Sequence, residues 1–227
     1  MNHKYHFTKM HGLGNDFILI DGINQRISNE AYGPLAKSLC SRQFGVGADG
    51  LIMVLKSDHS DFRMRIFNAD GSEPEMCGNG IRCFAKFVYD NHFIEKDVIT
   101  IETLAGIIVP GLIIKNGQVQ AIEVDMGEPI LKGADIPTTF TNDDTVINKT
   151  LTINKTDYTF SAVSMGNPHA IFFVDNLKEI NLKDLGPQIE SHPTFPNKTN
   201  VEFIQVLNPQ KALMLVWERG ASETLAC

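Results

Sequence analysis

A cysteine followed at once by a glycine-rich turn is the stretch of this sequence best suited to chemistry. The segment runs from Glu75 to Gly80 and reads EMCGNG. Apolar residues after it recur at the spacing of one helix face: Ile81, Phe84, Ala85 and Val88. We therefore expect a helix that begins beside Cys77, where unpaired N–H groups and the helix dipole favour a thiolate over a thiol. The alternative, on this stretch alone, is a small buried cysteine at a helix cap.

The second half of the chain repeats landmarks of the first. Residues 14–17 read GNDF and residues 166–169 read GNPH, each after an expected strand. Gly-Ser-Glu precedes Cys77, and Gly-Ala-Ser-Glu precedes Cys227. The Asn-to-Cys separation is 62 residues in the first half and 60 in the second. Unless short loops match by chance, this spacing predicts two domains of one design, each contributing an Asn and a Cys to a shared cleft.

Many short strands with few helices must position these residues. Expected strands cover residues 5–10, 17–21, 51–55, 62–67, 98–103, 107–115, 118–125, 151–153, 158–163, 170–174, 201–205 and 213–217. Asn116-Gly117 indicates a hairpin turn. Helices are expected from Ser28, whose hydroxyl would cap the first turn, to about Leu39, and over residues 182–189.

This pattern predicts an α+β fold of two similar lobes, each a curved, mostly antiparallel sheet around a central helix. A segment punctuated by Gly and Pro, residues 127–137, marks the expected boundary. The predicted domains are thus residues 1–126, which carry Cys77, and residues 127–227, which carry Cys227.

Composition narrows the class of partner. A chain of 227 residues with a formal net charge of −7 lacks the basic surface that nucleic acids need, so we expect a small-molecule partner. No apolar run reaches the length of a membrane span, and the N-terminus lacks a signal-peptide core, so a cytoplasmic protein with reduced cysteines is expected.

The other cysteines are expected to be structural. Cys83 should point away from Cys77 around the helix and lie in the core, and Cys40 should pack in the last turn of its helix. The cysteine spacing does not match a zinc site, because no Cys-x-x-Cys pair is present.

Five motifs, taken together, resemble diaminopimelate epimerase. They are residues 11–17 (HGLGNDF), 67–73 (FNADGSE), 76–80 (MCGNG), 166–169 (GNPH) and 218–227 (ERGASETLAC). The resemblance implies interconversion of L,L- and meso-2,6-diaminopimelate without pyridoxal phosphate or metal, in lysine and peptidoglycan precursor synthesis. It also implies a homodimer.

Epimerisation at an α-carbon needs a base on one face and an acid on the other, and two cysteines can exchange these roles. The resemblance assigns both roles, with Cys77 as the proton donor to the L,L substrate and Cys227 as the acceptor. It implies that two residues tune the cysteine pKa values, His169 and Glu218. Implied substrate contacts are Asn15, Asn68, Asn167, Asn200, Glu218 and Arg219, and the backbone amides of Gly78 and Asn79 are expected to hold a carboxylate.

Two departures from the family pattern stand out. In the family, Gly-Ser-Gly or Gly-Thr-Gly and a second central helix follow the second cysteine, whereas this sequence ends at Cys227. We therefore expect a second lobe that is truncated before its central helix. A family Gln that contacts substrate is Gly50 here, so that contact is not expected.

Two other interpretations remain open. The first is another two-cysteine isomerase of the proline racemase type, although its motif usually reads Met-Cys-Gly-His-Gly. The second is a non-catalytic thiol protein.

Overall fold

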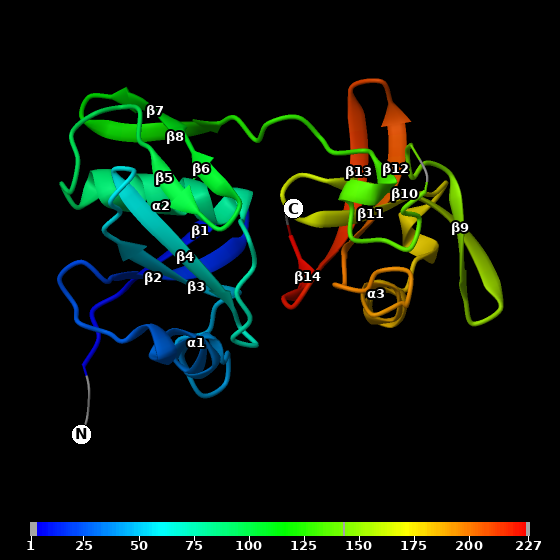
Figure 1. Ribbon diagram of the computed structural model, residues 1–227, viewed down its shortest axis with the longest axis horizontal. Coiled ribbons are helices and arrows are strands. Elements are labelled where there is room, and N and C mark those ends of the chain that lie inside the picture. The colour runs from blue at the N-terminus through cyan, green and yellow to red at the C-terminus, as the bar shows by residue number, and fades with distance from the viewer. Residues whose placement is uncertain (1–3, 143, 226–227) are drawn as a thin grey trace. The chain divides into compact units, whose positions relative to one another are not determined.

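The computed structural model describes residues 4–142 and 144–225 (Figure 1). The chain folds into two compact units, one that ends at Met126 and one that runs from Gly127 to Leu225. We call them the N-terminal unit and the C-terminal unit. No helix among the described residues is both long enough and apolar enough to cross a membrane.

Six strands form the sheet of the N-terminal unit, in the order of the chain. They are β1 (Thr8–Gly12), β2 (Asn15–Asp21), β3 (Gly50–Leu55), β4 (Phe62–Asn68), β5 (Ile101–Thr103) and β6 (Gly106–Ile108). Neighbouring strands are antiparallel except for the β2–β3 and β4–β5 pairs, which are parallel. Parallel neighbours need a crossover connection, and a helix supplies it between β2 and β3.

Helices cover both faces of this sheet (Figure 1). The helix α1 (Tyr32–Cys40), preceded by the 3₁₀ turn η1 (Asn29–Ala31), packs on one face, and α2 (Gly78–Asp90) packs on the other. Successive side chains of a strand point to opposite faces, so Ile18 faces α1 while Leu19 faces α2. Burial on both faces explains why β2 and β3 read as continuous apolar runs.

A two-stranded hairpin, β7 (Pro110–Lys115) and β8 (Gln118–Val124), lies against α2. Asn116 and Gly117 form its turn, with φ values of 53° and 72°, which confirms the hairpin prediction.

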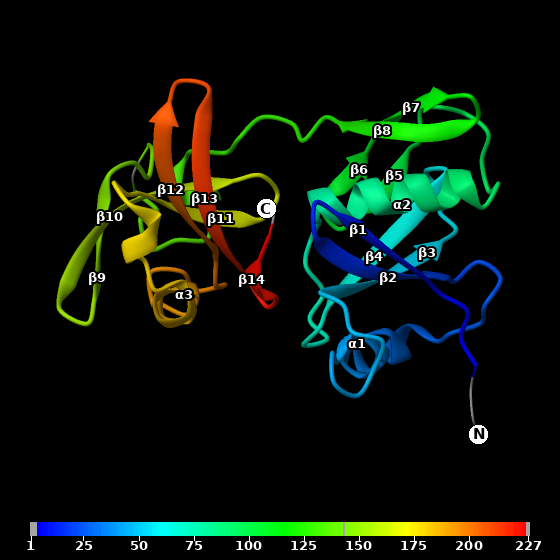
Figure 2. The same ribbon diagram turned by 180° about the vertical axis from the view of Figure 1, so that it is seen from behind.

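The C-terminal unit contains a second six-stranded sheet, in the order β14-β13-β12-β11-β10-β9. Its strands are β9 (Lys149–Ile153), β10 (Thr156–Ser164), β11 (Pro168–Phe173), β12 (Asn200–Asn208), β13 (Lys211–Glu218) and β14 (Ser222–Thr224). The helix α3 (Leu182–Glu190) packs on one face (Figure 2), and 3₁₀ turns η2 (Gly133–Asp135) and η3 (Leu177–Glu179) complete the unit.

The strands β10 to β13 repeat the arrangement of β1 to β4. In each set the first pair is antiparallel, the second is parallel with a helix in the crossover, and the third is antiparallel. Matched glycines begin the matched loops, with φ of 95° at Gly14 and 93° at Gly166. The prediction of an α+β fold with two similar lobes is confirmed. Among the described residues of the C-terminal unit, α3 is the α-helix, and by its connections it corresponds to α1.

Three local predictions were wrong. The Ser28 side chain makes no capping hydrogen bond, and α1 begins instead at Tyr32 after the η1 turn. The expected strand 107–115 is two strands, because the chain leaves the large sheet after β6 and enters the β7–β8 hairpin. Of the expected strand 98–103, only Ile101–Thr103 joins the large sheet, and Val98 instead forms a single bridge with Gly111.

Candidate functional site

Cys77 is the N-cap residue of α2. Its extended backbone (φ −143°, ψ 116°) turns the chain into the helix, and its sulfur accepts a hydrogen bond from the Gly80 amide at 3.4 Å. The sulfur therefore contacts an amide of the first helical turn, where the helix dipole favours negative charge. The helix prediction over this stretch is confirmed, and its apolar face is buried as expected.

Glycines let the start of α2 approach the sheet closely. A β-carbon at Gly12 would lie 3.1 Å from the carbonyl oxygen of Asn79, and one at Gly80 would lie 3.2 Å from both Ile52 and Ile66. This contact brings the β1–β2 turn, which precedes Asn15, against the helix that starts at Cys77. Local glycines thus place Asn15 and Cys77 at one end of the N-terminal unit.

Both predicted asparagines of this unit lie at the same end of the sheet, where β2 begins and β4 ends. Asn15 begins β2, while Asn68 ends β4 and pairs with Gly50, which itself pairs with Phe17. Asn15 is 1% exposed. The Asn68 amide donates to Ser72 Oγ at 3.0 Å, so its side chain is held in place.

A side chain that the sequence analysis missed engages Asn79. Arg82, one turn into α2, donates to the Gly78 carbonyl at 3.1 Å and to Asn79 Oδ1. Asn79 itself is 2% exposed. Its side-chain oxygen is therefore occupied within the helix, which leaves the backbone amides of Gly78 and Asn79 as the groups suited to an anion.

The other described thiols are suited to packing. Burial raises the pKa of Cys40 to about 12 and that of Cys83 to about 11. Cys40 ends α1, and Cys83, on the buried face of α2, lies in the core, as expected. Cys77, which is partly exposed, is the described thiol placed for chemistry.

An ion-pair cluster beside Asn15 was also missed. Arg42 Nη2 lies 2.9 Å from Asp16 Oδ1 and 2.6 Å from Asp49 Oδ1, and Lys9 Nζ lies 3.0 Å from Asp16 Oδ2. The Asp16 amide donates to Asp49 at 2.9 Å. Burial opposes ionisation of Asp16, but hydrogen bonds from Arg42 and Lys9 outweigh it and lower the pKa to about 2. The cluster fixes the loop that enters β3 to the strand that carries Asn15.

In the C-terminal unit, the predicted residues lie at the equivalent end of the sheet. Asn167 precedes β11, Asn200 begins β12 beside it, and Glu218 ends β13. The Asn200 side-chain oxygen accepts from the Arg219 amide at 2.8 Å, and the Arg219 guanidinium donates to the Asn197 carbonyl at 3.2 Å. Four predicted residues thus lie at one end of the sheet in this unit: Asn167, Asn200, Glu218 and Arg219.

His169, predicted as a residue that tunes a cysteine, lies between two polar partners. Its Nδ1 is 2.6 Å from Glu202 Oε1, and its Nε2 is 3.0 Å from Asn167 Oδ1. The sequence alone places Glu202 within an expected strand and does not predict this contact. The one signal in the sequence is a carboxylate inside the apolar run of β12.

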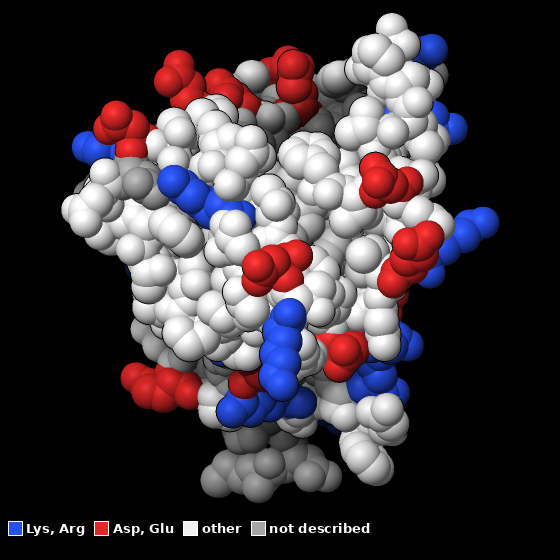
Figure 3. Space-filling model, turned by 90° about the vertical axis from the view of Figure 1, so that its right-hand side faces the viewer, with Lys and Arg blue, Asp and Glu red and all other residues white. Residues whose placement is uncertain are grey.

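Cys227, the second predicted cysteine, lies outside the described residues. No group of three or more His, Cys, Asp or Glu side chains in the described part of the chain is arranged to hold a metal ion. On the face drawn in Figure 3, acidic and basic side chains are interspersed and form no basic patch.

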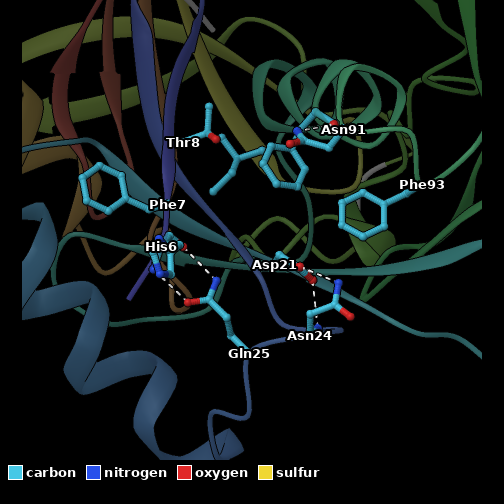
Figure 4. Close-up of a pocket in the computed structure, with 10 residues that line it drawn as sticks. His6, Phe7, Thr8, Asp21, Asn24, Gln25, Asn91 and Phe93 are labelled. Atoms are coloured by element: carbon cyan, nitrogen blue, oxygen red, sulfur yellow. Dashed lines mark hydrogen bonds between the residues drawn. The ribbon is translucent and has the colours of Figure 1, made fainter. Parts of the chain in front are cut away.

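A pocket of about 360 Å³ lies at the opposite end of β2 (Figure 4). Asp21, His6 and Gln25 line it, together with the aromatic rings of Phe87 and Phe93. Polar side chains of the pocket are hydrogen-bonded to neighbouring protein groups. The Gln25 side chain accepts from the His6 backbone amide and donates to the His6 carbonyl, and the Asp21 carboxylate accepts from the Asn24 side chain. None of the predicted site residues lines this pocket.

The family model and the sequence relatives of this chain carry the same description. The family model described as diaminopimelate epimerase matches residues 7–132 and 161–227. The chain is 53% identical over 221 residues to a diaminopimelate epimerase of Methanococcus maripaludis, covering 97% of this chain and 79% of that one. A diaminopimelate epimerase of Moorella thermoacetica is 51% identical over 222 residues, at 98% and 79% coverage. The family resemblance inferred from the five motifs is confirmed.

Solved structures share the fold at low sequence identity. A probable proline racemase from Agrobacterium radiobacter has a TM-score of 0.73 at 12% identity, covering 97% of this chain and 72% of that one. A hydroxyproline epimerase from Agrobacterium vitis has a TM-score of 0.69 at 14% identity, with the same coverage. At these identities the likeness concerns the fold alone.

Proposed function

The chain belongs to the diaminopimelate epimerase family and is an isomerase, and from this premise we propose that it interconverts L,L- and meso-2,6-diaminopimelate without a cofactor, through two cysteines. One observation carries the proposal. Cys77 caps α2 with its sulfur on the Gly80 amide, so a thiolate there faces stabilising N–H groups. Cys40 and Cys83, whose thiol pKa values are raised by burial, are not candidates.

The reaction is a transfer of two protons across one carbon. For the L,L substrate, the Cys227 thiolate takes the α-proton and its electron pair stays on the α-carbon as a carbanion. The Cys77 thiol then donates its proton to the opposite face and becomes the thiolate. No atom other than hydrogen moves, and the reverse reaction uses the same two groups with their roles exchanged.

Stabilising the carbanion is the difficult step. Negative charge that develops on the α-carbon spreads into the adjacent carboxylate, and backbone amides aimed at that carboxylate stabilise it. In the N-terminal unit we assign this task to the amides of Gly78 and Asn79. Arg82 holds the Asn79 side chain so that the helix start keeps one geometry.

Substrate recognition is assigned to the polar residues at the matching ends of the two sheets. Asn15 and Asn68 act in the N-terminal unit, and Asn167, Asn200, Glu218 and Arg219 act in the C-terminal unit. An Arg guanidinium can pair with a carboxylate through two hydrogen bonds, while the Glu and Asn side chains can bind the ammonium and carboxylate groups. A substrate with an amino-acid group at each end fits this set better than proline does.

The wider context is also part of this proposal. We infer that residues 1–126, which carry Cys77, and residues 127–227, which carry Cys227, are the two domains of the enzyme. We also infer that His169 and Glu218 tune the two cysteines and that the enzyme acts in the cytoplasm as a homodimer. Its product would serve lysine and peptidoglycan precursor synthesis.

Turnover of three substrates tests the assignment. The purified full-length protein is incubated with L,L-diaminopimelate, L-proline and trans-4-hydroxy-L-proline, and stereoisomers are separated by chiral chromatography. We expect an L,L-to-meso equilibrium with the first substrate and no inversion of the other two. Faster inversion of proline would favour the racemase alternative, and inversion of none would favour the non-catalytic thiol protein.

A further inference from the structure

A buried carboxylate lies next to His169 in the C-terminal unit. Glu202, in β12, is 3% exposed, and its Oε1 lies 2.6 Å from His169 Nδ1. The other ring nitrogen of His169 lies 3.0 Å from Asn167 Oδ1. Glu202, His169 and Asn167 therefore form a line of hydrogen bonds that ends at a residue of the candidate site.

The internal repeat shows what the fold itself needs at these positions. Phe17 pairs with Gly50 in the first sheet, and His169 pairs with Asn200 in the second. Counting from the matched loops, His169 corresponds to Phe17, and Glu202, two residues after Asn200, corresponds to Ile52.

Phe17 is 3% exposed and Ile52 is 0% exposed, and both belong to the core beneath α2. The same strand positions thus form an apolar pair in one unit and a polar pair in the other. A sheet of this design can be built with apolar residues at both positions.

Burying a carboxylate has a free-energy cost that apolar side chains avoid. A buried ion pair is often no more stabilising than apolar residues of similar size, although removal of one partner alone is destabilising. Stability therefore does not explain the exchange of Phe and Ile for His and Glu. The polar pair occurs in the unit where Asn167 lies within reach of the ring, which favours a role in the site.

We propose that Glu202 is a positioning residue for the reaction, one that fixes the ring of His169 and, through it, the side chain of Asn167. The proposal rests on the proposed function, since it assumes that Asn167 contacts the substrate. A carboxylate and an amide oxygen only accept hydrogen bonds, so the ring donates to Glu202 through Nδ1 and to Asn167 Oδ1 through Nε2. The ring orientation then fixes how Nε2 meets the Asn167 amide, and hence which end of that amide is left for the substrate.

Two substitutions separate this role from a structural one. E202Q keeps the size of the side chain and removes its charge, and E202I copies Ile52 of the first unit. We expect both variants to fold, as judged by circular dichroism and thermal unfolding. We expect kcat/KM for diaminopimelate to fall on the order of 100-fold, because a small misplacement of a positioning group has an effect of this size. Ile204→Val, on the same face of β12, is the control and should leave kcat/KM unchanged.

The ring of His169 gives a readout that does not depend on turnover. Two-dimensional ¹⁵N–¹H spectra report which imidazole nitrogen carries a proton, and the His169 signals are identified by their loss in His169→Phe. We expect a protonated Nδ1 in the wild type and a changed pattern in E202Q and E202I. Unchanged ring signals, kcat/KM within about threefold of wild type, or failure of both variants to fold would each overturn the proposal.

The two proposals fail in different ways. A wild-type protein that does not epimerise diaminopimelate, while its His169 signals respond to E202Q, contradicts the proposed function and leaves the link from Glu202 to His169 intact. If the wild-type protein is active and the His169 ring signals are the same in E202Q as in the wild type, only the role of Glu202 is contradicted.

Discussion

Gly12 lies against the backbone of Asn79, at the point where the β1–β2 turn meets the start of α2. A β-carbon at residue 12 would lie 3.1 Å from the Asn79 carbonyl oxygen and 3.3 Å from its β-carbon. The glycine is therefore the residue that lets the loop carrying Asn15 touch the helix that begins beside Cys77. Side-chain size at residue 12 should control the geometry of this half of the site.

Gly12→Ala tests that relationship. The added methyl group must push the β1–β2 turn away from α2 by a few tenths of an ångström, which disturbs Asn15 relative to Cys77. We expect kcat/KM to fall about tenfold or more, since catalysis depends on such distances. Steady-state kinetics measure the change, and Gly111→Ala is the control because a β-carbon there meets nothing within 4 Å. Equal activity of the two variants would contradict the positioning role of Gly12.

Gly186→Ala tests the packing of the C-terminal unit. Gly186 lies inside α3, where alanine is normally favoured over glycine by up to about 1 kcal/mol. Here a β-carbon would lie 2.6 Å from two atoms of the Trp217 ring. The indole also donates to Glu190 at 2.8 Å, which restrains its movement. Overpacking should outweigh helix propensity, so we expect a net loss of roughly 1–3 kcal/mol in the free energy of unfolding. Denaturant unfolding measures it, and a variant more stable than wild type would show that the ring can move.

The sequence was sufficient to predict the features that depend on local pattern. The helix beside Cys77, the Asn116-Gly117 hairpin and the paired loops at Asn15 and Asn167 all follow from periodicity, turn chemistry or repeat spacing. Each is set by residues close together in the chain. The family resemblance added the identity of the chemistry, which no local pattern contains.

Long-range pairing explains what was missed. Glu202 and His169 are 33 residues apart, and only the parallel β11–β12 register brings them together. Arg42 meets Asp16 across 26 residues by a loop whose course the sequence does not indicate. The end of β6 at Ile108 was missed for a similar reason, because a continuous apolar run gives no sign that its halves join different sheets.

Acid sensitivity should depend on Asp16. Its pKa in the folded protein is lowered to about 2, so its ion pairs stabilise the fold above the ordinary carboxyl range and are lost as pH falls toward 2. Asp49, whose pKa is raised by burial and by the nearby Asp16, acts in the opposite direction. We expect Asp16→Asn to lower the unfolding midpoint at about pH 6 and to differ less from wild type at about pH 2.5. Thermal unfolding across this range measures the difference, with exposed Asp58→Asn as the control. A difference independent of pH would contradict the account.

The described cysteines should differ in reactivity toward iodoacetamide. Burial raises the thiol pKa values of Cys40 and Cys83, so few of these groups are thiolates at about pH 8, and both side chains are shielded. Cys77 at the helix N-cap should be alkylated first. Peptide mass spectrometry over a time course follows each site separately. Alkylation of Cys83 in the native protein as fast as Cys77 would contradict this ordering.

Proton exchange at the α-carbon tests the central claim most directly. In D₂O, the wild-type protein should incorporate deuterium at the α-carbon of diaminopimelate, which proton NMR and mass spectrometry detect without any coupling enzyme. Cys77→Ala should reduce the epimerisation of L,L-diaminopimelate, and with it the appearance of deuterated meso product, about 10²–10⁴-fold, because it removes the acid that completes inversion. The Cys83→Ser variant, which removes a buried thiol of the same helix, should epimerise and exchange at the wild-type rate if it folds normally. Epimerisation with exchange at the wild-type rate in Cys77→Ala would contradict the two-cysteine account.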